Sequence, residues 1–491
     1  MYCIRPQRGK HLFLTIYITV VLLRSPCLYL FPTSTDMPSH NLIRKDNWPL
    51  YAASAAFLLT ALLLGLHLLK NTNGAFSLTR DEAFLQLSTA KTLAFRHVWG
   101  IGRYDFAAAS PSLFYPLVLA VVFFIFGAKL ILVPMVNAVI AILLLIAINN
   151  WLMKRAVKPV TRLFILLAVV ALTPLPLIVI YGMERPLLLL FAFLFVSRLS
   201  DEWALPAFSR RTLIFGALMV ATRYDGVFLI AGVSLLLIYR RKWLEAFELA
   251  LWSLLPILVF GIVALFKGSY FLPNVFIVEP AGRLFSYDWL VGCGVAVAVP
   301  LLSHYGTGQQ HRKSRWSTAL IALSVGFLLT RNLYAFRETS KSSIQLHRLI
   351  YPAGKFAHRY CNKWAIVSDD IGVISYLTEG RYLDLSGLAS VKIARSRANN
   401  FYSTELVSQL SEEQYANLAI ISNRYTHGLP ESWIRTASWA LPGNGPAEKN
   451  GFTFYAMDTA IARILIHDLK EYSWFLPRDF TVQYFYSPPD K

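Results

Sequence analysis

"LYAASAAFLLTALLLGLHLL", residues 50–69, contains no Asp, Glu, Lys or Arg. A helix needs about 20 apolar residues to cross a bilayer, so this run is long enough to span one. The chain of 491 residues is 56% hydrophobic with a mean hydropathy of +0.48, and only 15% of its residues are charged, against about 25% in soluble domains. The sequence therefore predicts a polytopic membrane protein. Its spans are expected to be helices because no alternating barrel pattern is present.

Further apolar runs raise the expected number of transmembrane helices to about ten. They lie near Leu50–Leu69, Ser112–Phe126, Leu130–Leu152, Thr161–Tyr181, Pro186–Arg198, Thr212–Ala221, Val227–Tyr239, Leu249–Phe266, Tyr287–Ser303 and Ser317–Tyr334. Cytoplasmic loops carry most Lys and Arg. The basic clusters are Lys154–Arg162, Arg210–Arg211, Arg240–Lys242 and Arg312–Arg315. The intervening segments, and everything after Tyr334, are therefore expected outside. Two spans precede the first cluster where this topology needs one or three, so Ser112–Phe126 is tilted, re-entrant or miscounted.

Three parts are expected along the chain. Residues 1–49 form an N-terminal segment of open role, because its apolar run His11–Phe31 is interrupted by Arg24 and Pro26. A signal-like segment, an extra span and normally untranslated sequence upstream of a start at Met37 all fit this run. Residues 50–340 form the transmembrane domain. The mixed charges and short apolar runs of residues 341–491 predict a soluble α/β domain, with a helical stretch at Thr404–Gln414. Its expected strands are Lys363–Asp369, Arg381–Gly387, Asn417–Asn423 and Phe452–Asp458.

The net charge of +19 belongs almost wholly to the residues before Lys341. A basic excess in a membrane protein reflects cytoplasmic loops and contacts with membrane lipid, so nucleic acid is not an expected partner. Some of these cations are candidates for binding a phosphate-bearing lipid substrate. The four cysteines are scattered without metal-type spacing, which indicates neither a disulfide framework nor a zinc site.

Adjacent carboxylates follow the first span in "SLTRDEAFLQLSTAKTLAF" (Ser77–Phe95). One reading is structural: Thr79 caps a helix, and Asp81 and Glu82 in its first turn favour the helix dipole. This reading is compatible with catalysis, because a carboxylate fixed at a helix start is well placed to act on a substrate. Further acidic residues fall on the same expected outer face, and they are Asp105, Glu184 and Asp225.

Each of these outer carboxylates has a simple alternative role as a solvated loop residue or an ion-pair partner. Arg185 lies beside Glu184, and Arg223 lies close to Asp225. Taken as a set on one face, however, they indicate a polar site under an outer loop. Outer loops are normally poor in cations, yet several are expected here: Arg80, Arg103, Arg185, Arg223 and Lys267.

Glycosyl transfer is a chemistry that such a site supports. A general base takes a proton from the acceptor hydroxyl as that hydroxyl attacks the anomeric carbon. Arg or Lys stabilises the charge on a leaving lipid phosphate. The chain has neither a P-loop nor a G-x-G-x-x-G after a strand, which agrees with a lipid-linked rather than a nucleotide-linked donor.

An ordered series of segments carries a family resemblance. After the acidic pair come "AAASPSLFYPLVLA" (Ala107–Ala120), "GMERPLLLL" (Gly182–Leu190), "ATRYDGVFLI" (Ala221–Ile230), "YFLPNVF" (Tyr270–Phe276) and "SDDIGVISYLTEGRYLDLSGL" (Ser368–Leu388). Together they resemble the GT-C superfamily of polyprenyl-phosphate-sugar-dependent glycosyltransferases. Within it, bacterial members similar to the mycobacterial terminal arabinofuranosyltransferase are the nearest. The resemblance implies a bacterial inner membrane location, with the site and the C-terminal domain facing the periplasm or exterior.

The resemblance also implies roles for individual residues. Asp81 is implied as the general base, with Glu82 sharing that role or coordinating a divalent metal, whose requirement is open. The substrate-binding candidates are Arg80, Arg103, Glu184, Arg223, Asp225, Lys267 and Asn274. The implied partners are a polyprenyl-phosphate sugar donor and a glycan, lipid or protein acceptor. Where the family often has Arg-Pro-Asp-Gly this chain has Arg-Tyr-Asp-Gly, and Ala109–Leu113 also departs from the family pattern, so the donor sugar stays open.

Two rival functions remain, and one further motif has two interpretations. A transporter or flippase of lipid-linked sugars places its charged groups near the bilayer midplane, often within repeats, and no repeat is present. A membrane scaffold leaves the outer polar set unexplained. Asp369 and Asp370 are interpreted as loop residues, with Gly372 and Gly380 at turns, although a metal or phosphate site there is an alternative. The C-terminal part is expected to help bind the acceptor or to shape the site entrance.

Overall fold

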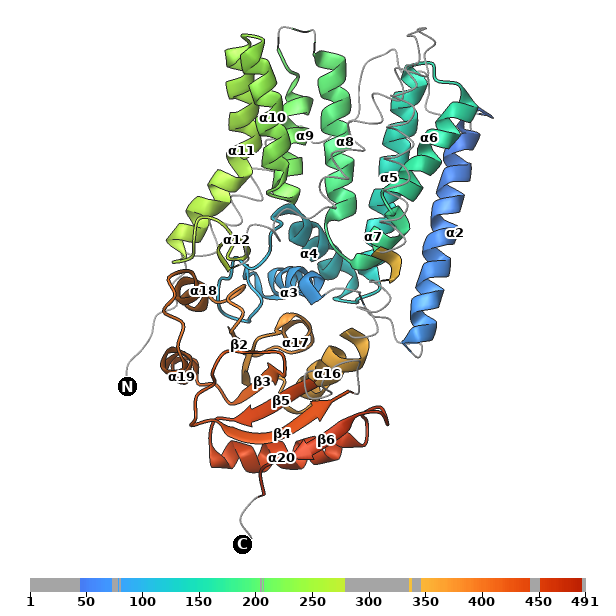
Figure 1. Cartoon of the computed structure of the whole chain (residues 1–491). Coiled ribbons are helices and arrows are strands. Elements are labelled where there is room, and N and C mark those ends of the chain that lie inside the picture. Colours follow the sequence, from blue (N-terminus) through green and yellow to red (C-terminus); the bar gives the residue numbers. More distant parts are fainter. Residues whose placement is uncertain are drawn as a thin grey trace. The chain divides into compact units, whose positions relative to one another are not determined.

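The protein is described by a computed structural model (Figure 1). The described residues are 45–72, 78, 81–203, 205, 207–278, 335–337, 346–441 and 451–487. Met1–Trp48 and Pro49–Lys491 form separate compact units. In the first of them, a short 3₁₀ helix covers Lys45–Asn47. All other elements below belong to the second unit, apart from the first residue of α2.

Three described helices are long and apolar enough to cross a membrane: α2 (Trp48–Asn71), α5 (Leu132–Lys154) and α11 (Trp243–Phe266). A fourth span arises if α6 (Pro159–Leu172) and α7 (Leu175–Tyr181) are counted together across their 42° bend. Many of the apolar side chains on these helices are exposed. Such exposure is favourable only where lipid or another apolar partner covers the side chains. The expectation of helices able to cross a membrane is therefore confirmed.

The expected total of about ten transmembrane helices is not supported. The apolar helices α4 (Phe114–Phe126) and α10 (Gly226–Tyr239) have 13 and 14 residues, and α9 (Arg210–Thr222) has 13. These lengths fall short of the roughly 20 residues of a full span. Helix α8 (Arg185–Glu202) has 18 residues but carries charges at both ends. The expected spans Tyr287–Ser303 and Ser317–Tyr334 lie outside the described residues.

The helices after α7 pack in a sequential series, in which α8 contacts α5 and α9, and α11 contacts both α9 and α10 (Figure 1). A small residue allows the α9–α11 contact to be close. A Cβ added at Gly216 would lie 2.7 Å from the Ser253 side-chain oxygen. At their other ends these helices meet α3 (Asp81–Arg96), α4 and the short α12 (Val275–Val278).

The C-terminal part contains a six-stranded sheet of order β2-β1-β3-β5-β4-β6, which confirms the predicted α/β domain. Strands β2, β1 and β3 pair in parallel, and β3, β5, β4 and β6 pair antiparallel. In chain order the strands are β1 (Ala365–Ser368), β2 (Arg381–Asp384), β3 (Leu418–Ser422), β4 (Ile434–Ala440), β5 (Gly451–Ala456) and β6 (Thr481–Tyr484). The accompanying helices are a π-helical turn Leu346–Ile350, α16 (Tyr351–Tyr360), α17 (Gly372–Leu377), α18 (Val391–Ala398), α19 (Thr404–Glu413) and α20 (Thr459–Ser473).

Four of the strands and α19 were expected from the sequence, whereas β4 and β6 were not. The sheet core on the antiparallel side is aromatic. Trp439 of β4 is buried against Phe356, Phe454 and Tyr472, with ring centroids 4.5 to 5.6 Å apart. Such ring pairs add to the stability gained from burying their area alone.

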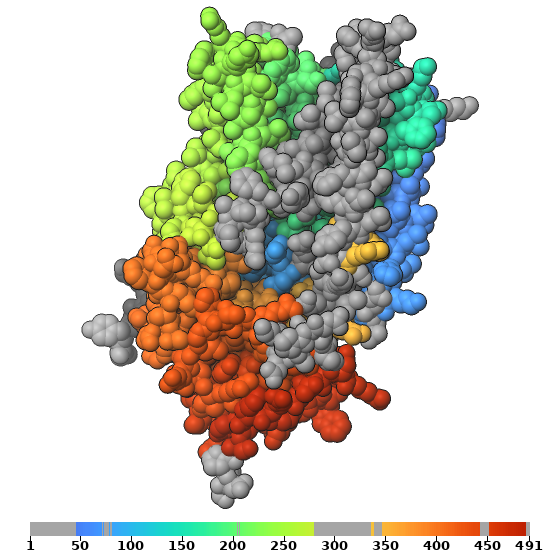
Figure 2. Space-filling model, in the orientation of Figure 1, coloured from blue at the N-terminus to red at the C-terminus, as the bar shows by residue number. Residues whose placement is uncertain are grey.

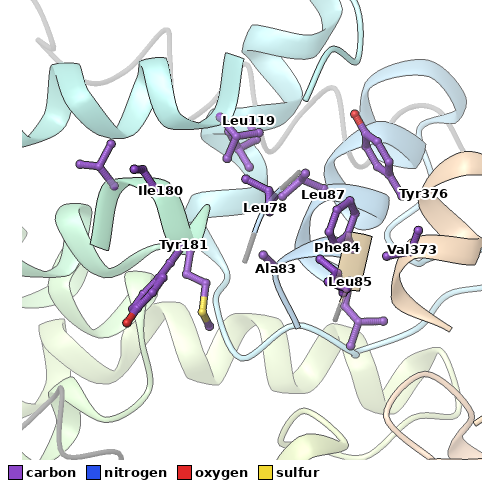
Figure 3. Packing of buried hydrophobic residues seen from close by; sticks show 14 of the residues in the cluster. Leu78, Ala83, Phe84, Leu85, Leu87, Leu119, Ile180, Tyr181, Val373 and Tyr376 are labelled. Carbon is purple, nitrogen blue, oxygen red and sulfur yellow. The ribbon is translucent and has the colours of Figure 1, made fainter. Parts of the chain in front are cut away.

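Helix α3 lies between the membrane helices and the C-terminal domain. Every residue from Ala83 to Ala90 is buried, so the helix is covered all round rather than on one face. Figure 3 shows Leu87 of α3 gathered with Leu78 and Leu119, and Phe84 next to Val373 of α17. One continuous apolar cluster therefore joins α3, α4, α7 and the C-terminal domain.

Candidate functional site

Asp81 is the first residue of α3 and contacts the C-terminal domain directly. Its Oδ1 accepts a hydrogen bond of 3.1 Å from the Val373 backbone N–H, at the start of α17. Its carboxyl group also shares a side-chain hydrogen bond with Asp370. Gly372 is required here, because a Cβ at that position would lie 2.6 Å from Asp81 Oδ1 and closer still to Oδ2. Thr79, the expected cap of this helix, lies outside the described residues.

The two carboxyl groups affect each other's pKa. Desolvation by the surrounding protein raises the pKa of Asp81, and the nearby charges of Glu82 and Asp384 raise it further, while the hydrogen bonds from Asp370 and Val373 oppose this. Desolvation raises the pKa of Asp370 well above its ordinary value, and the negative charge of Asp81 adds to the shift. Like charges in contact cannot both ionise readily. Asp370 therefore keeps its proton and donates a hydrogen bond to the Asp81 carboxylate.

Asp81 and Asp370 are both of intermediate exposure, so neither residue is completely enclosed by the described protein. With one hydrogen bond from Val373 and one from Asp370, the Asp81 carboxylate still has free acceptor positions. Such a group can receive a proton in general-base catalysis. Glu82, its neighbour in the sequence, is exposed.

The other acidic residues of this region hold loops in place. Asp384, at the end of β2, is fully buried and accepts hydrogen bonds from the backbone N–H groups of Ser386 and Ala389, at 2.9 and 2.7 Å. Asp369 accepts hydrogen bonds from both the backbone and the hydroxyl of Ser422. Desolvation raises the pKa of Asp369 to about 6. These residues lie at the carboxyl ends of the parallel strands, where open α/β sheets bind ligands.

Sequence reasoning assigned Asp370 to a loop and missed its contact with Asp81. The signal that points to it is the adjacent Asp369–Asp370 pair directly after a short buried strand. The same edge receives Asp384 from the neighbouring parallel strand β2. The sequence cannot show that α3, nearly 300 residues earlier, reaches that edge.

A second charged cluster lies at the ends of α8 and α9. Arg223 donates to Glu184 Oε1 at 2.7 Å and to Asp225 Oδ2 at 2.6 Å. The Glu184 side chain is fully buried, and its other oxygen accepts a 2.7 Å hydrogen bond from the Gln86 side chain of α3. The structure thus brings three predicted substrate-binding residues together as an ion-pair network. Because Arg223 is already neutralised, the network fits the structural alternative and positions α3.

The remaining predicted residues are scattered. Asn274 is fully buried, and neither atom of its side-chain amide has a hydrogen-bond partner among the described residues. Its backbone N–H donates to Ala108, so two of the family-like segments meet there. Lys267 is exposed at the end of α11, Arg103 lies in a separate cavity, and Arg80 is outside the described residues. In the described ranges no group of three His, Cys, Asp or Glu side chains is arranged to hold a metal ion.

Comparison with known proteins gives one match. Residues 338–455 match the model of a domain of unknown function (DUF8728), which covers most of the C-terminal α/β part and includes Asp369, Asp370 and Asp384. No curated protein and no solved structure matches the chain. The family-like resemblance of the membrane part therefore stays a prediction.

Replacing Arg223 should destabilise the protein strongly. Arg223→Met leaves Glu184 buried without a countercharge, which costs about 3–5 kcal/mol in the free energy of unfolding. The double variant with Glu184→Gln should recover part of that loss. Unfolding of the full chain in detergent micelles, titrated with SDS, measures both.

The matched control is Arg348→Met. Arg348 pairs with Asp479 at 3.4 Å on the surface, where both side chains are more than a third exposed. Its loss should cost at most about 1 kcal/mol. Equal effects of the two Arg changes would contradict a structural role for the Arg223 network.

Proposed function

We propose that the chain is a membrane glycosyltransferase that moves a sugar from a polyprenyl-phosphate donor to a glycan, lipid or protein acceptor. The observation that carries the proposal is the Asp81 carboxylate, which is hydrogen-bonded by Asp370 and the Val373 N–H and belongs to a residue of intermediate exposure. A base for this reaction needs a fixed carboxylate within reach of the acceptor hydroxyl. The order of family-like segments supports the same chemistry.

In the proposed reaction, the acceptor oxygen attacks the anomeric carbon while Asp81 takes the hydroxyl proton. The bond from that carbon to the phosphate oxygen breaks, and the phosphate leaves on the lipid, with inversion at carbon. The buried amide of Asn274 has no hydrogen-bond partner among the described residues, so it offers a donor and an acceptor to a sugar hydroxyl that reaches it. Arg223 is a positioning residue in this scheme, because it already binds two carboxylates.

The membrane arrangement proposed here uses α2, α5 and α11 as spans, with α4, α8, α9 and α10 filling the domain between them. Arg155 pairs with Asp201, and Lys242 donates to the Leu205 carbonyl, so basic residues gather at one end of these helices. Glu184 and Arg223 lie at the other end. By the positive-inside rule the Asp81 end faces outward, which in a bacterium is the periplasmic side of the plasma membrane.

A transporter of lipid-linked sugars is the second candidate, favoured by the 42° break between α6 and α7. Broken helices often form substrate sites in transporters. A transporter would move the lipid across vesicles without releasing lipid phosphate, so the product separates the two functions.

Asp81→Asn should abolish transfer. The full-length protein is incubated with a panel of polyprenyl-phosphate sugars and candidate acceptors, and the release of lipid phosphate is followed. Removing a general base typically costs a factor of about 10²–10⁴ in rate. Glu82→Gln, one residue away but exposed, should retain most activity if Asp81 alone is the base. Near wild-type release by Asp81→Asn would remove Asp81 from that role.

Gly372→Ala should slow the reaction without changing any charge. The new Cβ must displace the Asp81 carboxylate, and a shift of about 1 Å can cost a hundredfold in rate. Gly232→Ala is the control, because a Cβ at that helical position meets no atom within 4 Å. The two variants are compared by kcat at saturating donor. Equal kcat values would mean that the position of Asp81 does not matter.

Asp370→Asn should shift the pH profile. Asn still donates a hydrogen bond to Asp81, but it removes the second ionisable group. Desolvation, the largest cause of the raised pKa of Asp81, is unchanged and the opposing hydrogen bond is kept, so the acid limb of kcat against pH should stay near its wild-type position. The change should come at high pH, where loss of the Asp370 proton no longer puts a second negative charge beside Asp81. An alkaline limb identical to that of the wild type would contradict coupling between the two carboxyl groups.

A further inference from the structure

A polar cavity of about 320 Å³ lies at the opposite end of α3 from Asp81. Arg96, the last residue of α3, pairs with Glu379 in its wall at 2.9 Å. The cavity is lined by Arg103, Tyr104, Lys363, Ala365, Glu379, Gly380, Arg381, Gln414, Tyr415 and Asn417. Its volume is that of a site for one small molecule or one sugar unit. In Figure 2, blue atoms of the α3–α4 region reach the surface between the green helices and the orange C-terminal domain.

The charge of this cavity is strongly one-sided. Arg103, Lys363 and Arg381 line it, and none of the three forms an ion pair with a described residue. Arg103 and Arg381 both lie 5.4 Å from the centre of the Tyr104 ring, which holds the two cations close together. The sole acidic residue in the lining, Glu379, is already engaged by Arg96. Three cations without an ion-pair partner among the described residues favour an anionic ligand.

Exposed aromatic rings stand beside these cations. The Tyr104 side chain is 59% exposed and that of Tyr415 is 77% exposed. Tyr415 has a positive φ of 54° because it follows the end of α19, where the Ala416 N–H donates to the Ser411 carbonyl and closes the helix. Flat rings of this kind offer apolar faces to the C–H groups of a sugar ring, as amphipathic aromatic residues do at interfaces.

Amide groups complete the lining. The Asn417 side chain accepts a 3.1 Å hydrogen bond from the Ala365 backbone N–H, which fixes its orientation and leaves its NH₂ group to donate. Gln414 adds a second amide. Cations, exposed rings and amides together match a ligand that has a negative charge, an apolar ring face and hydroxyl groups.

We infer that this cavity binds a carboxylate- or phosphate-bearing sugar unit of a glycan acceptor. The inference deepens the proposed function, on which its acceptor role rests, by naming the chemical class of that acceptor. The 16 residues of α3 separate the cavity from Asp81 by about 22 Å, at 1.5 Å per residue. The bound unit is therefore remote from the reacting hydroxyl, so the acceptor is a chain rather than a monosaccharide. Binding of remote units can be used to position the reacting one.

Binding of defined probes to the full-length protein in detergent tests the inference by calorimetry. Trigalacturonate should bind, and its affinity should fall at least tenfold between 50 and 500 mM salt. Neutral maltotriose should bind at least tenfold more weakly. A phosphorylated sugar, glucose 6-phosphate, and inorganic phosphate distinguish a phosphate-specific site from a general anionic-sugar site. Equal binding of maltotriose, or no binding of trigalacturonate and glucose 6-phosphate alike, would overturn the inference.

Variants locate the site. Lys363→Gln with Arg381→Gln should weaken binding of the charged sugar at least tenfold, and Tyr415→Ala should weaken it several-fold without changing the salt dependence. Arg463→Gln is the matched control, because Arg463 is an exposed residue of α20 outside the cavity lining. Unchanged binding in the double variant would overturn the inference. A lipid-headgroup site would also overturn it. Such a site would bind phosphatidylglycerol vesicles more tightly than trigalacturonate, and the double variant would lose that vesicle binding.

The same measurements on Asp81→Asn separate this inference from the proposed function. That variant should bind trigalacturonate as the wild type does, because it leaves the cavity intact. Binding without any transfer would refute the enzyme while keeping the site. Transfer to glycans that is unaffected by the double Lys363 and Arg381 change would refute the acceptor role while keeping the enzyme.

Discussion

The contact of Asp81 with Asp370 and the Val373 N–H ties the membrane helices to the C-terminal domain. It is one of several contacts along α3. Ser88 and Ser375 share a 2.9 Å hydrogen bond, and Lys91 donates to the Tyr376 carbonyl at 2.7 Å. A helix buried on all sides must satisfy its polar groups with protein partners. Because those partners belong to both halves, α3 can keep its place only while both halves are folded around it.

The carboxylates near α3 fall into two chemically different groups. Glu184 and Asp225 both pair with Arg223, so each of these carboxylates faces a positive charge. Asp81 and Asp370 meet each other, and desolvation raises the pKa of both carboxyl groups, although the charge of Arg424 opposes the rise at Asp370. Acid and base roles arise where the surroundings make the pKa values of two neighbouring groups differ. The Asp81–Asp370 pair has such surroundings.

The sequence carried the features that depend on local pattern. Continuous apolar runs predicted α2, α5 and α11, short apolar runs predicted four of the six strands, and neighbouring charges indicated the Arg223–Asp225 pair. The apolar runs did not predict the lengths of the helices, because α4, α9 and α10 have only 13 or 14 residues each. Long-range contacts were not predicted either. Asp370 meets Asp81 because α17 packs along α3, and no local signal encodes that packing.

Contacts at three points along α3 give the site its geometry. Asp81 meets Val373, Ser88 meets Ser375, and Arg96 meets Glu379 of the C-terminal domain. A sliding or tilting motion of the domain would have to break contacts at both ends of the helix together. The distance between the Asp81 carboxylate and the basic cavity is therefore fixed by the length of one helix. A chain-like ligand that is held in the cavity would present its other end to Asp81 at a set separation.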